Sequence, residues 1–225
     1  MPGRTTHTHS DALRRSHDEG SERRRLAREF YARPVLRVAR DCVGKLLVHD
    51  LGGRVLVGRI VEAEAYRGPE DLAAHSARGR RTPRNEAMWG EAGHAYVFFV
   101  YGQHWHLNLV TGAPGEPHAV LIRAVEPVEG TELMARRRGM SADRRELTNG
   151  PGKLCVAFGI DRRYDRFDLA GGGALYLADA PKTRVVRARR VGIDYAGAWA
   201  ERPWRFCEAG NRYVSRAPEG RLRDK

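Results

Sequence analysis

The run from residue 54 to residue 66, RVLVGRIVEAEAY, is the sequence feature that most constrains the fold, because its alternating small apolar residues are typical of a long strand. Successive side chains of a strand point to opposite faces. Counting alternate positions therefore places Glu62, Glu64 and Tyr66 on one face at the end of the strand. The same count assigns three further residues to the face of the acids: Leu56, Gly58 and Ile60.

Further strand-like runs surround this one. Residues 45–51 precede it across Gly52-Gly53, and residues 95–101 and 104–110 flank Gly102-Gln103, so each pair predicts a hairpin. Residues 118–130 predict another strand. Short strands are expected near 174–177 and 183–188, and helices from Pro34 to before Gly44, over 131–138, and after Pro151 as a capped helix. The pattern predicts an α+β fold with one mixed domain and a mainly antiparallel sheet.

Domain organisation follows from where this patterning begins and ends. Residues 1–24 are polar and charged without periodic apolar positions, and we expect a disordered N-terminal tail. Residues 25–218 are expected to form the single domain, and residues 219–225 a C-terminal tail. The sequence contains no repeat of 20 to 50 residues, so a solenoid is not expected.

Composition limits the partners. The longest apolar stretch is only strand length, so no membrane span is expected, and the first residues lack the apolar core of a signal peptide. The three cysteines make no closed disulfide set and indicate a reduced, cytoplasmic protein. The formal net charge of +12 makes nucleic acid the first partner to consider.

Two segments carry features suited to nucleic acid. The loop from residue 67 to 93 is rich in arginine and is expected to form a phosphate-binding rim with Arg78, Arg80, Arg81 and Arg84. The hairpin after it has aromatic residues near its tip, as stacking on bases would require. An ordinary core role is the alternative, and we favour it for four hairpin residues: Phe99, Trp105, Leu107 and Leu109.

Charged residues on predicted strands suggest a catalytic site. Glu62 and Glu64 would have Cα atoms about 6.5 Å apart, and such a pair can divide acid and base duties, or one acid can act alone on water. Arg123 lies on an apolar strand face, with Val125 among its neighbours in the count, and must find an anion there. Glu64 is a candidate partner.

Two other functions remain open at this point. His104 and His106 share a strand face and could begin a metal site, although no H-E-x-x-H or C-x-x-C motif is present. A DNA- or RNA-binding module without catalysis would use the same arginines and aromatic residues. The three cysteines lie in apolar contexts and are interpreted as inert core residues.

Three consecutive motifs carry a family resemblance: GRIVEAEAYRGPEDLAAHSARGRRTPRN (58–85), AYVFFVYGQHWHLN (95–108) and AVLIRAVEPVEG (119–130). Together with segments on either side, from about residue 28 to 214, they resemble the alkyladenine-type 3-methyladenine DNA glycosylase family. The resemblance implies a curved sheet with surrounding helices and a protruding hairpin that inserts into DNA.

Carried over residue by residue, the resemblance implies that Glu64 activates the water that attacks the sugar, with Arg123 holding the carboxylate and water, and Glu62 only a neighbour. The base pocket would place Tyr66 and His75 on one side of a flipped base and Phe98 on the other, where well-known members have a tyrosine. Three further roles follow: Asn108 disfavours guanine, Tyr101 intercalates, and Arg80, Thr82 and Lys153 contact the DNA backbone.

The resemblance further implies a monofunctional hydrolase of N-glycosyl bonds that removes alkylated purines such as 3-methyladenine and leaves an abasic site in base excision repair. Its partner would be double-stranded DNA with alkylated or deaminated purines. No cofactor and no metal are expected, and we expect a monomer in the bacterial cytoplasm with the nucleoid. Cationic purines are good leaving groups that aromatic faces attract, so one carboxylate suffices.

Overall fold

The computed structural model describes residues 23–100 and 102–218. Residues 1–22 of the predicted N-terminal tail, the predicted C-terminal tail 219–225 and Tyr101 lie outside the described residues. The first described residues already contact the domain: Arg24 accepts a main-chain hydrogen bond from Asp179, and Leu26 donates one to Leu177.

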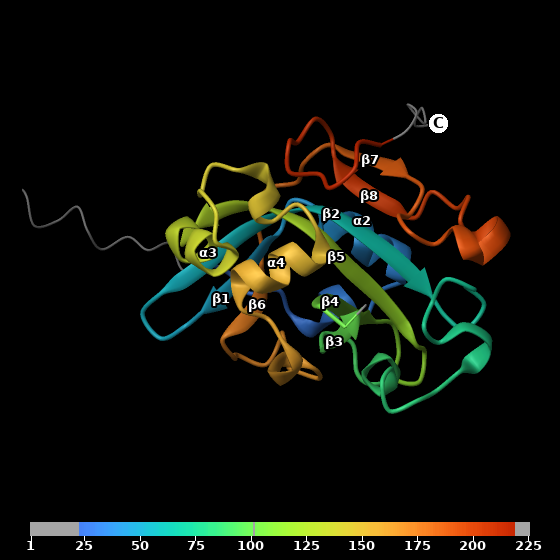
Figure 1. The fold of residues 1–225 in the computed structure, drawn as a ribbon. Helices are drawn as coiled ribbons and strands as arrows, with labels where there is room; N and C mark the ends of the chain where they lie inside the picture. The colour runs from blue at the N-terminus through green and yellow to red at the C-terminus, as the bar shows by residue number, and fades with distance from the viewer. Residues whose placement is uncertain (1–22, 101, 219–225) are drawn as a thin grey trace, which may run out of the picture.

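A mainly antiparallel sheet forms the centre of the molecule (Figure 1). Its main path runs β3-β4-β5-β2-β1-β6, and β8 pairs with both β2 and β7. Every pairing among the described strands is antiparallel, which confirms the predicted α+β class. The strands are β1 (Leu46–Asp50), β2 (Val55–Arg67), β3 (Ala95–Val100), β4 (His104–Thr111), β5 (His118–Glu129), β6 (Leu175–Ala178), β7 (Val185–Ala188) and β8 (Arg205–Glu208).

Four α-helices of the described residues accompany the sheet: α1 (Arg28–Tyr31), α2 (Val35–Cys42), α3 (Thr131–Arg138) and α4 (Pro151–Phe158). Pro34 precedes α2, and its fixed φ suits the start of a helix. The apolar stripe of α2 packs on β2 and β5, and α4 packs on β4 and β5. The last three helices match their predictions, although no side chain caps the N-terminus of α4.

Irregular pairing between β2 and β5 changes which β2 side chains face the core, so the faces predicted by counting alternate residues are partly wrong. Leu56 and Ile60 belong to the main core, and so do Ala63 and Ala65, which the count put on the opposite face. The pairing with β5 shifts register between Ile60 and Ala63, and such a bulge reverses which side chains face the core. Glu62, Glu64 and Tyr66 do share a face, as predicted, but Leu56 and Ile60 do not share it.

The same irregularity affects β5. Arg123 does not share its face with Val125, as the count predicted, because Val125 belongs to the main core while Arg123 lines a pocket on the other side. Position 58 is a glycine for a related reason, since a Cβ there would come within 2.8 Å of the Val125 side chain.

Other predictions for the hairpin and the cysteines are largely confirmed. Leu107 and Leu109 are fully buried and Trp105 packs against the core, but Phe99 is 42% exposed, so its predicted core position is wrong. The three cysteines are free and buried, and burial raises the pKa of each thiol. None of the helices in the described part of the chain is long and apolar enough to span a membrane.

Candidate active site

Glu64 is fully buried in the second half of β2, where three donors hold its carboxylate. The Tyr66 hydroxyl donates to Oε2 at 2.8 Å, Arg123 Nη1 donates to Oε2 at 3.3 Å, and the Val191 amide donates to Oε1 at 2.8 Å. An ionised carboxylate has about four acceptor sites, so these three donors leave one of them unfilled. The predicted pairing of Glu64 with Arg123 is confirmed.

Glu62 occupies a different environment from Glu64. Its Oε1 accepts from Arg123 Nε at 3.2 Å and from Arg205 Nη1 at 2.9 Å, and its Oε2 accepts from the Ser215 amide at 2.6 Å. Glu62 is fully buried and does not line the pocket. It therefore joins β5, β8 and the segment after β8, and it orients Arg123 toward Glu64.

The two carboxylates also control the charge of Arg123. Burial acts to lower the pKa of the Arg123 guanidinium, but Glu64 and Glu62 outweigh that effect and raise it. Arg123 stays cationic, with its Nε facing Glu62 and its Nη1 facing Glu64. The group is a compact arrangement in which buried charges are paired, as burial requires.

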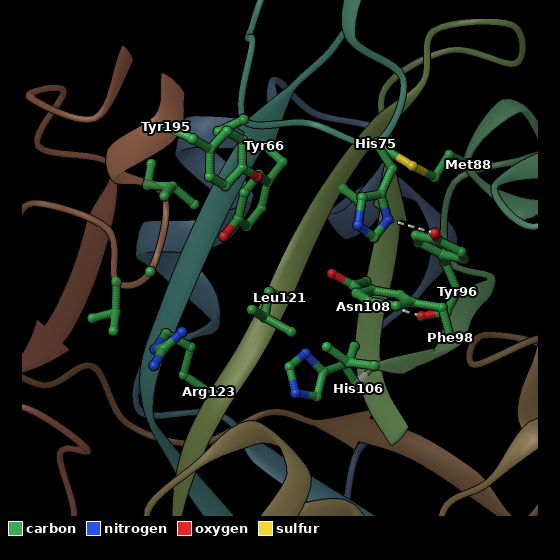
Figure 2. A pocket seen from close by; sticks show the side chains of 16 residues that line it. Tyr66, His75, Met88, Tyr96, Phe98, His106, Asn108, Leu121, Arg123 and Tyr195 are labelled. Carbon is green, nitrogen blue, oxygen red and sulfur yellow. Dashed lines mark hydrogen bonds between the residues drawn. The ribbon is translucent and has the colours of Figure 1, made fainter. Parts of the chain in front are cut away.

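A cavity of about 140 Å³ adjoins this group, with Arg123 in its wall (Figure 2). All three donors to Glu64, namely Tyr66, Arg123 and Val191, line it, so the carboxylate lies immediately behind the cavity wall. The remaining wall is mostly aromatic or apolar. It comprises Ala73, His75, Met88, Tyr96, Phe98, Val100, His106, Asn108, Ala119, Leu121, Gly192, Ile193 and Tyr195.

Aromatic side chains face one another across the cavity, in an arrangement that differs from the expected one. His75 was expected beside Tyr66, opposite Phe98. Instead the rings of His75 and Phe98 lie together, with centroids 4.5 Å apart, and Figure 2 shows both across the cavity from Tyr66. The reason is that His75 Nδ1 hydrogen-bonds the Tyr96 hydroxyl at 2.8 Å, and Tyr96 stacks on Phe98.

Tyr66 is held from behind by a buried ion pair. Arg190 pairs with Asp71, through Nη2 and Oδ1 at 2.9 Å, and both side chains are fully buried. The Arg190 guanidinium also lies 4.8 Å from the centroid of the Tyr66 ring. Burial raises the pKa of Tyr66 far above its usual value, and Glu64 adds to this effect. The hydroxyl therefore stays protonated and acts as the hydrogen-bond donor to Glu64.

Two cavity histidines are neutral near pH 7. Burial, assisted by Arg84 and Arg80, lowers the pKa of the half-exposed His75 to about 4. Burial and then Arg123 lower the pKa of His106 to about 4. Neutral imidazoles add hydrogen-bonding groups to the wall without placing positive charge there.

Asn108 is buried on β4 and donates from Nδ2 to the Tyr96 carbonyl at 3.1 Å. It lines the cavity beside Leu121, which is its partner in the β4-β5 pairing. The sequence placed Glu64, Tyr66, Arg123, His75, Phe98 and Asn108 in one site, and the fold brings all six together.

A second concavity, of about 390 Å³, adjoins the first and shares His75, Tyr96 and Tyr195 with it. Arg78, Arg80, Thr82 and Arg84 of the loop after β2 line this concavity. Arg81 does not, because it pairs with Glu86 through Nη2 and Oε1 at 2.5 Å and lies over Trp89. Three of the four arginines predicted to form the rim thus lie beside the cavity, and the fourth, Arg81, does not.

One predicted DNA contact lies away from both concavities. Lys153 is on α4, where its Nζ donates to Asn149 Oδ1 at 2.8 Å, and it lines neither concavity. Its neighbour Gly152 packs against His104, the first residue of β4, so Lys153 lies near the tip of the β3-β4 hairpin. Tyr101, the expected intercalating residue, falls outside the described residues.

Sequence reasoning missed several cavity residues. The segment around Val191 and Tyr195 closes one side of the cavity, yet no periodicity marked it, because it is a loop followed by the 3-10 helix η5 (Asp194–Trp199). Tyr96 was counted only as a strand residue. His106 was weighed as a metal ligand, and no cluster of three His, Cys, Asp or Glu side chains suited to a metal occurs within the described ranges.

Comparison with known proteins identifies the family of the chain. The chain matches the methylpurine-DNA glycosylase (MPG) family over residues 29–212. Three relatives carry the name "Putative 3-methyladenine DNA glycosylase". The protein of Desulfitobacterium hafniense is 51% identical over 201 residues, 85% of this chain and 98% of its own. The protein of Anaeromyxobacter sp. is 52% identical over 196 residues, which are 86% of this chain and 94% of its own. The protein of Methanocella arvoryzae is 48% identical over 197 residues, which are 87% of this chain and 98% of its own.

The fold, the site and these similarities define a DNA glycosylase, a hydrolase that acts on N-glycosyl bonds. More particularly, the chain belongs to the methylpurine-DNA glycosylase family.

Proposed function

We propose that this chain removes alkylated purines such as 3-methyladenine from duplex DNA, with Glu64 as the general base that activates water. The observation that carries the proposal is the position of Glu64. It is buried directly behind an aromatic cavity, and each of its three hydrogen-bond donors forms part of the cavity wall. A water entering between them would meet a fixed carboxylate, as general base catalysis requires.

The proposed chemistry is one-step hydrolysis. Glu64 accepts a proton from water, the water oxygen bonds to the sugar C1′, and the N-glycosyl bond breaks as its electrons pass to the purine. Arg123 keeps the carboxylate oriented and is itself restrained by Glu62. Glu62 has no role in proton transfer in this proposal, since its oxygens face Arg123, Arg205 and Ser215 behind the cavity.

The cavity walls suit a flat, cationic base. Tyr66 lies on one side, and His75 with Phe98 on the other, so a purine between them would contact aromatic faces. Attraction between a cation and an aromatic face is worth about 0.5 to 2 kcal/mol. Both cavity histidines are neutral near pH 7 and do not repel an N-alkylated purine.

A purine stacked in a duplex cannot reach a buried carboxylate, so the proposal includes extrusion of the nucleotide from the helix. Arg78, Arg80 and Arg84 line the adjoining concavity, where they would bind the phosphates that flank the extruded nucleotide. Tyr101, which follows β3 in the sequence, would fill the gap in the stack, and Thr82 and Lys153 would contact the backbone.

The test is base release from duplexes that each carry one lesion. The chain should free 3-methyladenine and leave a strand that breaks only on alkaline treatment, because hydrolysis creates an abasic site without cutting the backbone. Excision should proceed in the presence of EDTA. Binding of the duplex without release of any base would contradict the proposal and would favour a non-catalytic DNA-binding module.

A further inference from the structure

A basic groove of about 630 Å³ lies outside the site described above. Its wall comes from residues 24–45, which include α1 and α2, and from residues 179–185, which end on the first residue of β7. Six of its residues are cations and two are acids. The cations are Arg24, Arg33, Arg37, Arg40, Lys45 and Lys182, and the acids are Asp41 and Asp179.

The two acids are already paired within the groove. Asp41 Oδ2 accepts from Arg33 Nη1 at 2.8 Å, and Asp179 binds Arg24 and, at 2.7 Å, the Lys45 ammonium. Three exposed cations, Arg37, Arg40 and Lys182, make no ion pair with a carboxylate in the described part of the chain. The groove therefore holds positive charge that is not neutralised from within.

Part of the wall of the groove is apolar. Leu26, Phe30, Val43 and Val185 contribute to it, and the Arg33 guanidinium lies 4.5 Å from the Phe30 ring centroid. Arg33 Nη2 is buried without a hydrogen-bond partner among residues 23–100 and 102–218. Cations on a firm apolar base are suited to an extended anion of repeated phosphates rather than to one small ion.

The groove lies on the opposite side of β2 from the base cavity. α2 packs on the core face of β2, with Ala63 and Ala65, whereas Glu64 and Tyr66 point to the other face. The residues that line the groove and those that line the cavity have no member in common. The groove and the cavity are therefore separate surfaces on opposite sides of β2.

We propose that this groove binds the phosphate backbone of a second DNA segment while the cavity face holds the first. The enzyme would then pass directly from one duplex to another through a complex that contains both, without becoming free in solution. Two sites on one rigid domain give the second segment an effective concentration that assists this exchange. The spacing of Arg37 and Arg40 on one helix, about 4.5 Å along its axis, keeps both cations on the groove side.

The experiment follows a labelled, undamaged duplex bound to the full chain. Unlabelled duplex is added at rising concentration and constant ionic strength, and the loss of fluorescence anisotropy gives the dissociation rate. Direct transfer makes this rate rise in proportion to the unlabelled duplex, whereas simple dissociation leaves it constant. With three phosphates contacted, the concentration-dependent part should fall about 40-fold between 50 and 200 mM salt.

The test variant is Arg37→Glu with Arg40→Glu and Lys182→Glu. We expect it to lose at least about nine-tenths of the concentration-dependent rate, because about three phosphate contacts disappear. The matched control is Arg54→Glu with Arg136→Glu and Arg162→Glu, which changes net charge equally at exposed positions outside both the groove and the cavity. The control should keep the concentration dependence.

Base release under single-turnover conditions is measured on the same samples. The groove variant should release 3-methyladenine at the wild-type rate, which shows that it is folded and that the cavity works. A wild-type dissociation rate that does not depend on added duplex would overturn the proposal. A groove variant with undiminished transfer would overturn it too, whereas loss of base release in the wild type would contradict only the function proposed above.

Discussion

Tyr66 and Glu64 act as one unit, because the Tyr66 hydroxyl donates to Glu64 Oε2 at 2.8 Å while its ring forms one wall of the cavity. The residues are two apart on β2, on the face that the bulge leaves turned away from the core. A base resting on the Tyr66 ring would therefore be placed at a fixed distance from the buried carboxylate.

Replacing Tyr66 by Phe tests this coupling. The ring stays and one of the three donors to Glu64 is lost, so the carboxylate becomes less restrained. We expect the single-turnover rate of base release to fall about tenfold, the worth of one hydrogen bond of roughly 1.4 kcal/mol. Tyr176→Phe, at a position outside the cavity, is the control and should react at the wild-type rate. An undiminished rate in Tyr66→Phe would show that the hydroxyl does not orient Glu64.

Glu62→Gln should mainly affect stability. It removes a buried anion shared by Arg123 and Arg205, which leaves positive charge uncompensated. Breaking such a buried pair costs roughly 3 to 5 kcal/mol of the free energy of unfolding, measured by urea denaturation. Glu201→Gln removes the exposed pair with Arg189 and should change the midpoint far less. Equal midpoints in the two variants would contradict a structural role for Glu62.

Acid should destabilise the fold well above the range in which carboxylates titrate. The pKa of His106 is lowered to about 4, and burial also lowers the pKa of His49, which lies between the Phe158 carbonyl and the Tyr164 hydroxyl. Below the usual value of about 6.5, and for His106 down to about pH 4, the unfolded chain binds protons at these residues that the folded chain does not bind.

The free energy of unfolding should therefore have its full value above about pH 6.5 and should decrease as the pH falls toward 4. Urea titrations at constant ionic strength across this range measure it. His49→Gln should show a smaller decrease than the wild type. A free energy of unfolding that is constant over the whole window would contradict the lowered pKa values.

His106 should influence which lesions are released. Phe98 offers no hydroxyl, and the neutral imidazole of His106 lies beside it with ring centroids 5.5 Å apart. A neutral base such as hypoxanthine depends more on hydrogen bonds than a cationic one does. His106→Phe should lower release of hypoxanthine relative to 3-methyladenine about fivefold, as loss of a hydrogen bond of roughly 1 kcal/mol would do. His104→Gln, at an exposed position outside the cavity, should leave that ratio unchanged, and an unchanged ratio in His106→Phe would refute the role.

The sequence predicted the elements of the fold where local rules decide them. Gly52 and Gly53 have the positive φ values of a tight turn, 71° and 94°, and the hairpins and three of the helices lie where periodicity placed them. Neither β8 nor α1, each four residues long, was predicted. The bulge in β2 was not predictable from parity, since it depends on how β5 pairs with it.

The sequence predicted which residues form the candidate site, but it did not predict how they are arranged. The motifs gave Glu64, Tyr66 and Arg123, but the pairing of His75 with Tyr96, which moves His75 to the wall of Phe98, is a tertiary contact. Arg190 behind Tyr66 likewise comes from a segment more than a hundred residues away and had no motif to mark it.

The most direct test of the central claim compares Glu64→Gln with wild type on a duplex containing 3-methyladenine. Base release is measured with enzyme in excess, and binding to the same duplex is measured separately by anisotropy. Gln keeps the shape of the side chain but cannot accept the proton of water, so release should become undetectable while the duplex is still bound. Release at or near the wild-type rate by a variant that binds normally would show that Glu64 is not the general base.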